Sequence, residues 1–103
     1  MSYDSYFETG VTRAGFRYVA YWDGEHCGEY DTHAKAARAV ALRDKADKAA
    51  QELDKASRPY FCDGRYGAWR AIEYGQALPP KVETAFQRHH AASMALARHR
   101  GLA

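Results

Sequence analysis

Large aliphatic side chains are scarce in this chain, and this scarcity limits the folds that it can adopt. Among 103 residues, isoleucine, leucine and valine together number 10, whereas alanine alone numbers 20. Alanine lets helices approach closely but buries little surface, so the 14 aromatic residues are expected to supply most of the large buried surface. A chain of this length is expected to form one domain, residues 1–103, with a thin core that a second copy could complete.

The aromatic residues and the alanines occupy different parts of the chain. Eight of the 14 aromatic residues lie within residues 3–30 and five within residues 60–74, whereas 15 alanines lie within residues 34–56 and 85–103. This separation predicts an α+β fold with a sheet–helix part, residues 6–57, followed by an aromatic segment and a C-terminal helix, residues 58–103.

Residues 6–31 show the alternation that is typical of strands. We expect a three-stranded antiparallel sheet, with a first strand at Tyr6–Thr12, a link through Ala14-Gly15, and a third strand at about His26–Tyr30. Asp23-Gly24 predicts a tight hairpin, because both residues tolerate positive φ. The residues expected on the core face of the second strand are Phe16, Tyr18, Ala20 and Trp22, and those expected on its other face are Arg17, Val19, Tyr21 and Asp23.

Two helices are expected after the sheet. The first runs from His33 to about Ala56, behind a cap at Asp31-Thr32, and is longer than a small sheet can cover. Dimerisation through its uncovered half is therefore expected. The second runs from about residue 81 to 100 and is stopped by Gly101, with Val82, Ala85, Phe86, Ala92 and Leu96 on its apolar face. Between them, residues 58–80 fit either a hairpin around Asp63-Gly64 or a short helix with Tyr66, Trp69 and Ile72 on one face.

One stretch of the sequence resembles a known family. Gly28, Tyr30, Asp31 and Thr32, followed by Ala36-Ala37 and preceded by Tyr18-Val19-Ala20, resemble the ethylene-response-factor (Apetala-type) DNA-binding domain. Its relatives occur in phage and mobile-element proteins, and integrase arm-binding domains share the architecture. The resemblance covers about residues 6–45. It implies a small DNA-binding accessory or regulatory protein that places its sheet in the major groove of duplex DNA.

Five residues follow from this resemblance as candidate DNA contacts. Arg13 and Arg17 stand where the family carries basic contacts, and Tyr21 lies on the same strand as Arg17. The aromatic segment could add two further cations. The candidate nucleic-acid-binding residues are Arg13, Arg17, Tyr21, Arg65 and Arg70.

The charge distribution supports an alternative function. Residues 1–31 hold two basic and six acidic side chains, whereas residues 58–103 hold seven basic and three acidic ones. Asp23 also stands where the family commonly has arginine. An acidic, aromatic sheet surface suits a basic partner. The alternative is a protein-binding inhibitor or adaptor, similar to an anti-CRISPR protein, that blocks a host nucleic-acid-binding protein through Tyr21, Trp22, Asp23 and Glu25.

Several other classes of function are not expected from this sequence. Nucleotide-binding, hydrolase and metalloprotease motifs are absent from it, so we expect no enzyme and no cofactor. Cys27 and Cys62, with the five histidines, show none of the spacings of a zinc site, so no metal is expected. No signal peptide and no membrane span are expected, which places the chain in the cytoplasm with both thiols free and buried.

Overall fold

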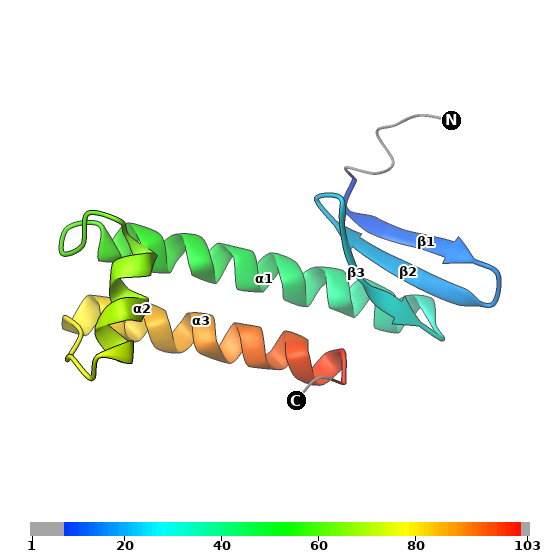
Figure 1. Ribbon diagram of the computed structural model, residues 1–103. Helices are drawn as coiled ribbons and strands as arrows, with labels where there is room; N and C mark the ends of the chain where they lie inside the picture. The colour runs from blue at the N-terminus through cyan, green and yellow to red at the C-terminus, as the bar shows by residue number, and fades with distance from the viewer. Residues whose placement is uncertain (1–7, 102–103) are drawn as a thin grey trace. The chain divides into compact units, whose positions relative to one another are not determined.

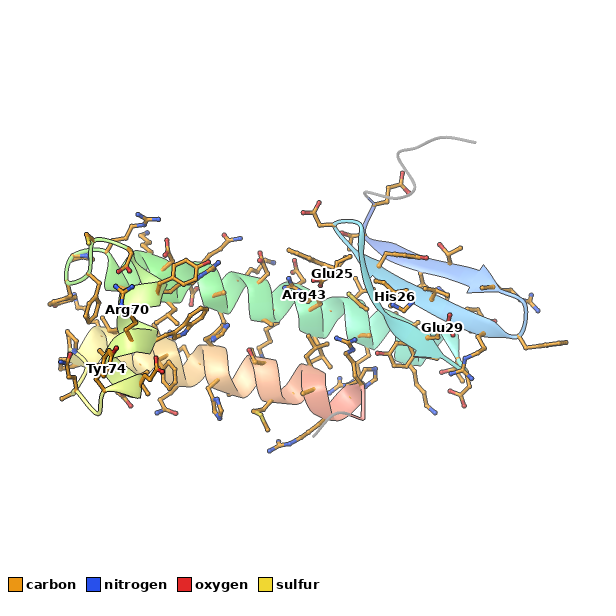
Figure 2. The ribbon with its side chains drawn as sticks, viewed as in Figure 1. Glu25, His26, Glu29, Arg43, Arg70 and Tyr74 are labelled. Carbon is orange, nitrogen blue, oxygen red and sulfur yellow. The ribbon has the colours of Figure 1, made fainter. Side chains whose placement is uncertain are left out.

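The computed structural model describes residues 8–101 and has the expected α+β architecture (Figure 1), and Figure 2 adds the side chains. A three-stranded antiparallel sheet in the order β1-β2-β3 is followed by three helices. The elements are β1 (Gly10–Ala14), β2 (Arg17–Trp22), β3 (Glu25–Tyr30), α1 (His33–Ser57), α2 (Arg65–Glu73) and α3 (Pro80–His99).

The two hairpin turns fix the pairing of the strands. Gly15 has a φ of 63°, and Asp23 and Gly24 have φ values of 48° and 80°, which confirms the tight turn predicted at Asp23-Gly24. Ala14 pairs with Arg17, so the first turn consists of Gly15 and Phe16. The predicted first strand is present, but its predicted bounds, Tyr6–Thr12, were wrong: the strand starts at Gly10 and continues to the turn, and residues 6 and 7 lie outside the described residues.

A bulge in β3 lets the sheet supply a tyrosine to its core. The pairing of β2 with β3 shifts between Val19 and Tyr21, and Gly28 on β3 has a φ of 107°. Cys27 and Tyr30 are three residues apart, yet both face α1, because the bulge adds one residue between them. The Tyr30 hydroxyl donates a 2.9 Å hydrogen bond to the Cys27 carbonyl. A Cβ on Gly28 would lie 2.9 Å from that hydroxyl, so the bulge has little room for any other residue.

The chain divides into two compact units. Unit 1 comprises Met1–Lys45 and Ala95–Ala103, and unit 2 comprises Ala46–Met94. The expected sheet–helix part, residues 6–57, thus contributes to both units, because α1 and α3 each run through the boundary.

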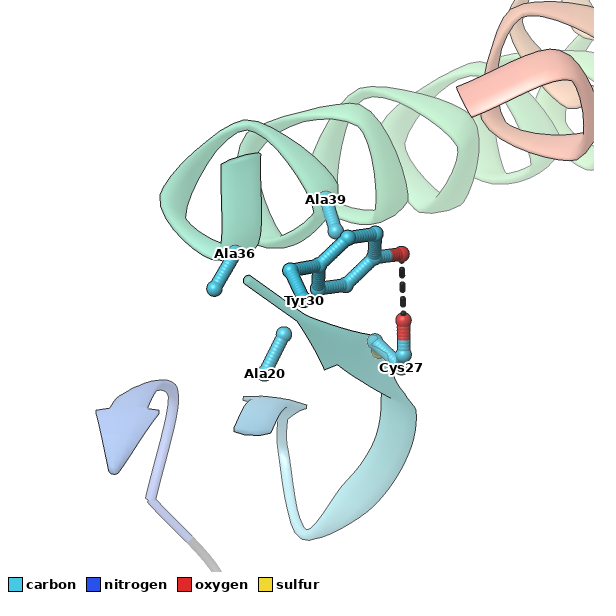
Figure 3. Close-up of a cluster of buried hydrophobic side chains, with 5 residues drawn as sticks. All are labelled: Ala20, Cys27, Tyr30, Ala36 and Ala39. Atoms are coloured by element: carbon cyan, nitrogen blue, oxygen red, sulfur yellow. Dashed lines mark hydrogen bonds between the residues drawn. The ribbon is translucent and has the colours of Figure 1, made fainter. Parts of the chain in front are cut away.

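In unit 1, the first half of α1 lies against one face of the sheet (Figure 3). Thr32 begins the helix as predicted, and its hydroxyl accepts a 3.2 Å hydrogen bond from the Lys35 N–H. Tyr18 and Trp22 pack against the core that the sheet and helix share, whereas Phe16 is 96% exposed. The prediction that Phe16 lies on the core face was wrong, because Phe16 belongs to the turn between β1 and β2. The buried residues of this core are Ala20, Cys27, Tyr30, Ala36 and Ala39.

In unit 2, the second half of α1 packs against α2 and α3 through small side chains. Leu53 and Val82 are fully buried, and Ala68 and Ala85 complete their cluster. Ala46, Ala49 and Ala92 form another. The apolar stripe on this half of α1, which was the reason to expect a dimer, is therefore covered within the chain itself.

The aromatic residues lie mostly around the cores or on the surface rather than at the centre of the cores: Tyr18, Trp22, Phe61 and Phe86 pack against the cores while partly buried. Among the described residues, Tyr30 is the single aromatic side chain in the buried set, which otherwise consists mainly of alanine. Of the two alternatives for this segment, residues 65–73 form the short helix and not the hairpin, and this helix turns Gly67, Ala68 and Ala71 inward. Its aromatic face points outward, because only small residues let α2 come close to its neighbours.

The end of α3 and the two cysteines can be compared with what the sequence predicts. The last helix ends as predicted before Gly101, which has a φ of 76° and donates its N–H to the Arg98 carbonyl. Cys27 is buried as predicted, whereas Cys62 is exposed, and both thiols are free. Within residues 8–101, none of the helices combines the length and apolar character that crossing a membrane requires.

We predict that Gly67→Ala destabilises the protein although alanine favours helices. A Cβ at this position would clash with the Phe61 side chain and lie 2.6 Å from Oδ1 of Asp63. Such overpacking costs about 1–3 kcal/mol, more than the roughly 1 kcal/mol that helix propensity contributes. Urea unfolding would measure the loss, with Glu73→Ala at an exposed position of α2 as the control. A variant more stable than the wild type would contradict this packing.

Candidate functional site

The face of the sheet that points away from α1 carries polar side chains from all three strands. The pairing places Thr12, Val19 and Glu29 in one row and Tyr21 beside His26 in the next. The Tyr21 and His26 rings meet edge to face, with centroids 5.9 Å apart. We call this surface the outer sheet face, and it also includes Arg17 at the start of β2; Figure 2 labels His26 and Glu29.

Arg13 and Arg17, the two arginines predicted to bind DNA, lie on opposite faces of the sheet. Arg17 lies on the outer sheet face, because it pairs with Ala14 and is two residues from Val19. Arg13 pairs with Tyr18, which packs against the core beside α1. The Arg13 Nε also donates a 3.2 Å hydrogen bond to the Gly15 carbonyl in the turn. A partner on the outer sheet face would therefore meet Arg17 and Tyr21 but not Arg13.

Trp22 and Glu25, two of the residues predicted to form a protein interface, instead contact side chains of α1. The Trp22 indole N–H donates a 3.2 Å hydrogen bond to Oδ1 of Asp44, and the Arg43 guanidinium lies 4.2 Å from the centre of the Trp22 ring. Arg43 Nε also forms a 2.6 Å ion pair with Oε2 of Glu25 (Figure 2). These contacts fasten the sheet to the helix, so Trp22 and Glu25 serve packing within unit 1.

Asp23 and Tyr21, the other two predicted interface residues, have different surroundings. Asp23 lies in the turn between β2 and β3, where its backbone N–H donates a 3.0 Å hydrogen bond to the Thr9 hydroxyl. Tyr21 lies on the outer sheet face. The four residues predicted for the protein interface are therefore not brought together on one surface.

Most of the negative charge of residues 8–31 is paired with basic side chains. Glu29 Oε2 lies 3.9 Å from Nε of Arg17, and Asp31 Oδ1 lies 3.0 Å from Nζ of Lys35. The hydrogen bond from Lys35 lowers the pKa of the Asp31 carboxyl below its usual value. With Glu25 held by Arg43, three carboxylates of this segment have a cation within 4 Å. Arg43 and Lys35, which come from α1, thus offset part of the acidic excess that the sequence shows.

Unit 2 presents an exposed cluster of rings and arginines on α2. The Arg65 guanidinium carbon lies 5.4 Å from the centre of the Tyr66 ring and 5.8 Å from that of Trp69. The Tyr66 and Trp69 rings meet edge to face at 5.3 Å, and His89 on α3 lies 6.1 Å from Trp69. Arg65 Nε is buried without a hydrogen-bond partner among the described residues, so ring contacts hold its side chain. We call these residues, with Ile72 and Tyr74, the α2 aromatic face.

The α2 aromatic face holds most of the exposed large apolar side chains of the described chain. Of six such residues in the whole described range, only Phe16 lies in unit 1. The exposed fractions on α2 are 53% for Tyr66 and 37% for Trp69. A helix face that places aromatic rings beside arginine has the composition of an interaction hot spot. The remaining exposed large apolar residues of unit 2 are Tyr60, Ile72 and Tyr74.

The spacing of Tyr66, Trp69 and Ile72 predicts a shared helix face but does not by itself say whether that face is buried or exposed. A second stripe, Gly67, Ala68 and Ala71, competes for the buried side of the same nine-residue helix. In a chain whose other helices pack through alanine, that small-residue stripe was the signal for the buried side. The aromatic side is then left exposed.

Two acidic residues contact α2, one at the Arg70 side chain and one at the backbone of Arg65. Arg70, labelled in Figure 2, forms an ion pair with Asp63. Asp54 on α1 accepts a 3.1 Å hydrogen bond from the backbone N–H of Arg65, which begins α2, and this hydrogen bond lowers the pKa of Asp54. A carboxylate from α1 therefore replaces a local cap at the start of α2. Arg65 and Arg70, both predicted to bind nucleic acid, belong to unit 2.

The side chains considered as metal ligands do not form a centre. Within residues 8–101, no three side chains of histidine, cysteine, aspartate or glutamate converge on one point. Burial raises the pKa of the Cys27 thiol, which favours its neutral form and makes it a poor nucleophile. Comparisons with protein-family models, curated proteins and solved structures find no match to this chain.

We predict that His89 makes the protein less stable as the pH falls. Burial, followed by the charges of Arg65 and His90, lowers the pKa of His89 in the folded state below its value of about 6.5 in the unfolded chain. The unfolded chain then binds more protons below about pH 7, so stability decreases from pH 7 toward pH 5.

Thermal unfolding across this range would test the prediction in His89→Gln. This variant should lose part of the pH dependence, whereas His33→Gln, which removes an exposed imidazole, should keep it. Equal slopes in wild type and His89→Gln would contradict the assignment.

Proposed function

We propose that the protein is a small, non-enzymatic DNA-binding accessory or regulatory protein of phage or mobile-element type. It binds duplex DNA with the outer sheet face. The observation that carries this proposal is the combination of hydrogen-bonding side chains on that face with carboxylates that are already paired. Thr12, Arg17, Tyr21 and His26 offer hydroxyl, guanidinium and imidazole groups from three adjacent strands. Glu29, the acidic member, is matched with Arg17.

The shape and chemistry of this face suit a major groove. A small β-sheet surface can enter a groove about 12 Å wide, where Arg17 could reach a phosphate or a guanine edge. Tyr21 and His26 support each other through their ring contact, which limits the rotamer freedom that binding must remove. The resemblance of residues 28–37 to the Apetala-type domain supports the same use of the sheet, and it is also the support for a phage or mobile-element origin.

We expect sub-micromolar binding to duplex DNA that weakens steeply with salt. Fluorescence anisotropy with a labelled duplex, repeated at several salt concentrations, would measure the affinity and its salt slope. Arg17→Ala should weaken binding about tenfold and reduce the slope by about one unit, because one phosphate neutralisation is lost.

Arg13→Ala is the matched control for this experiment. It removes the same charge from the neighbouring strand but from the opposite face, so binding should change less than threefold. Undetectable or salt-independent binding by the wild type would overturn the proposed function. Equal losses in the two variants would overturn its assignment to the outer sheet face.

The α2 aromatic face favours a second candidate function, a protein-binding inhibitor or adaptor. Exposed Tyr66 and Trp69 with Arg65 over their rings match the residue types that dominate protein interfaces. Under this alternative the partner is a host nucleic-acid-binding protein, and the docking surface is α2 rather than the acidic segment of the sheet.

Capture of a partner from host extract treated with nuclease, followed by binding measurements with that partner purified, would test this alternative. Trp69→Ala should reduce affinity at least tenfold, as truncation of a central aromatic anchor does. Phe16→Ala removes a ring from unit 1 that is more exposed than Trp69, and it should leave affinity unchanged. A complex that nuclease destroys, or equal affinities in the two variants, would contradict it.

A further inference from the structure

A groove in unit 1 lies beside the outer sheet face and is lined mainly by charged side chains. It has a volume of about 510 Å³ and is formed by the start of β2, the end of β3, the first turn of α1 and the end of α3. All four segments belong to unit 1. The lining residues are Arg17, Glu29, Tyr30, Asp31, Lys35, His99, Arg100 and Gly101.

The wall of the groove is fixed by contacts of His99. Its ring stacks on Tyr30, with centroids 5.1 Å apart and planes 27° from parallel. Its Nε2 lies 2.7 Å from the backbone carbonyl oxygen of Lys35. Because these contacts hold the end of α3 against β3 and the first turn of α1, Arg100 is positioned at the groove rather than on a free chain end.

The charges that line the groove leave a positive excess. Glu29 is matched with Arg17 and Asp31 with Lys35, so Arg100 remains as the third cation after both carboxylates are paired. The side chains of Arg17 and Lys35 remain 54% and 57% exposed, and both cations can contact a ligand without leaving their partners. An open groove with this balance of charge favours a small anion.

Resting on the proposed function, we propose that this groove binds a phosphate group, which in the DNA complex is a backbone phosphate of the duplex. Arg17 belongs both to the groove and to the outer sheet face, so a duplex on that face would bring its backbone to the groove. Arg100, which directly follows α3, and Lys35 on α1 then contact the phosphate oxygens. Contacts of this kind set the register of the duplex without reading its sequence.

The test compares two arginines at the same end of α3. Arg100→Ala removes a groove cation, whereas Arg98→Ala removes an exposed arginine that does not line the groove. Arg100→Ala should weaken binding about two- to fivefold for every duplex sequence and reduce the salt slope by about 0.9. Arg98→Ala should leave the slope within about 0.3 of the wild type. Equal effects of the two variants would overturn the groove assignment while leaving the proposed function in place.

A second arm uses inorganic phosphate as the probe and requires no DNA. In an NMR titration, phosphate should shift the amide signals of Tyr30, His99 and Arg100 in a saturable way, and chloride at equal ionic strength should not. Arg100→Ala should remove this response. Phosphate saturation without duplex binding would support the groove and overturn the proposed function. No saturable shift, together with an unchanged salt slope in Arg100→Ala, would overturn the groove alone.

Discussion

The structure depends on the close approach of backbones that its alanines and glycines permit. Leu53 and Val82 are the only large aliphatic side chains that are fully buried in the described chain. The rest of the unit 2 core is mainly alanine, which requires α2 to come close to α1 and α3. Because Gly67 and the alanines occupy the near side of α2, its rings have no place in the core. The exposed aromatic face is therefore a consequence of how this core is packed.

Unit 1 also has few large aliphatic side chains in its core, and it is held together by one buried tyrosine and a set of polar contacts. The bulge at Gly28 brings Tyr30 onto the core side, where its ring packs on α1 and its hydroxyl closes a hydrogen bond to β3. Trp22 and Arg43 then fasten the sheet to the helix at the edge of the core. These arrangements use the aromatic and acidic side chains that the sequence concentrates there, and they leave the outer sheet face with hydroxyl, imidazole and guanidinium groups.

Local signals in the sequence predicted most of the elements but not which faces they bury. The turn at Asp23-Gly24 and the cap at Thr32 depend on neighbouring residues, so their positions could be predicted, as could the bounds of α1 to within a residue. The opposite faces of Arg13 and Arg17 could also be predicted, because the expected link at Ala14-Gly15 and the observed turn at Gly15-Phe16 both pair Arg13 with a residue on the face opposite Arg17. The outward direction of Trp69 depends on helices distant in sequence, so no pattern on α2 alone decided between two competing stripes.

Charge shows most clearly why a site cannot be judged from a segment by itself. The first 31 residues carry a clear acidic excess, which argues against DNA as long as those residues are considered alone. In the fold, Glu25 and Asp31 are paired with Arg43 and Lys35, which come from α1. Such exposed pairs contribute little to stability, yet they lower the repulsion that a phosphate backbone would meet. The charge of residues 8–31 is thus set partly by the helix, whereas on the outer sheet face itself Glu29 is paired with Arg17 from β2.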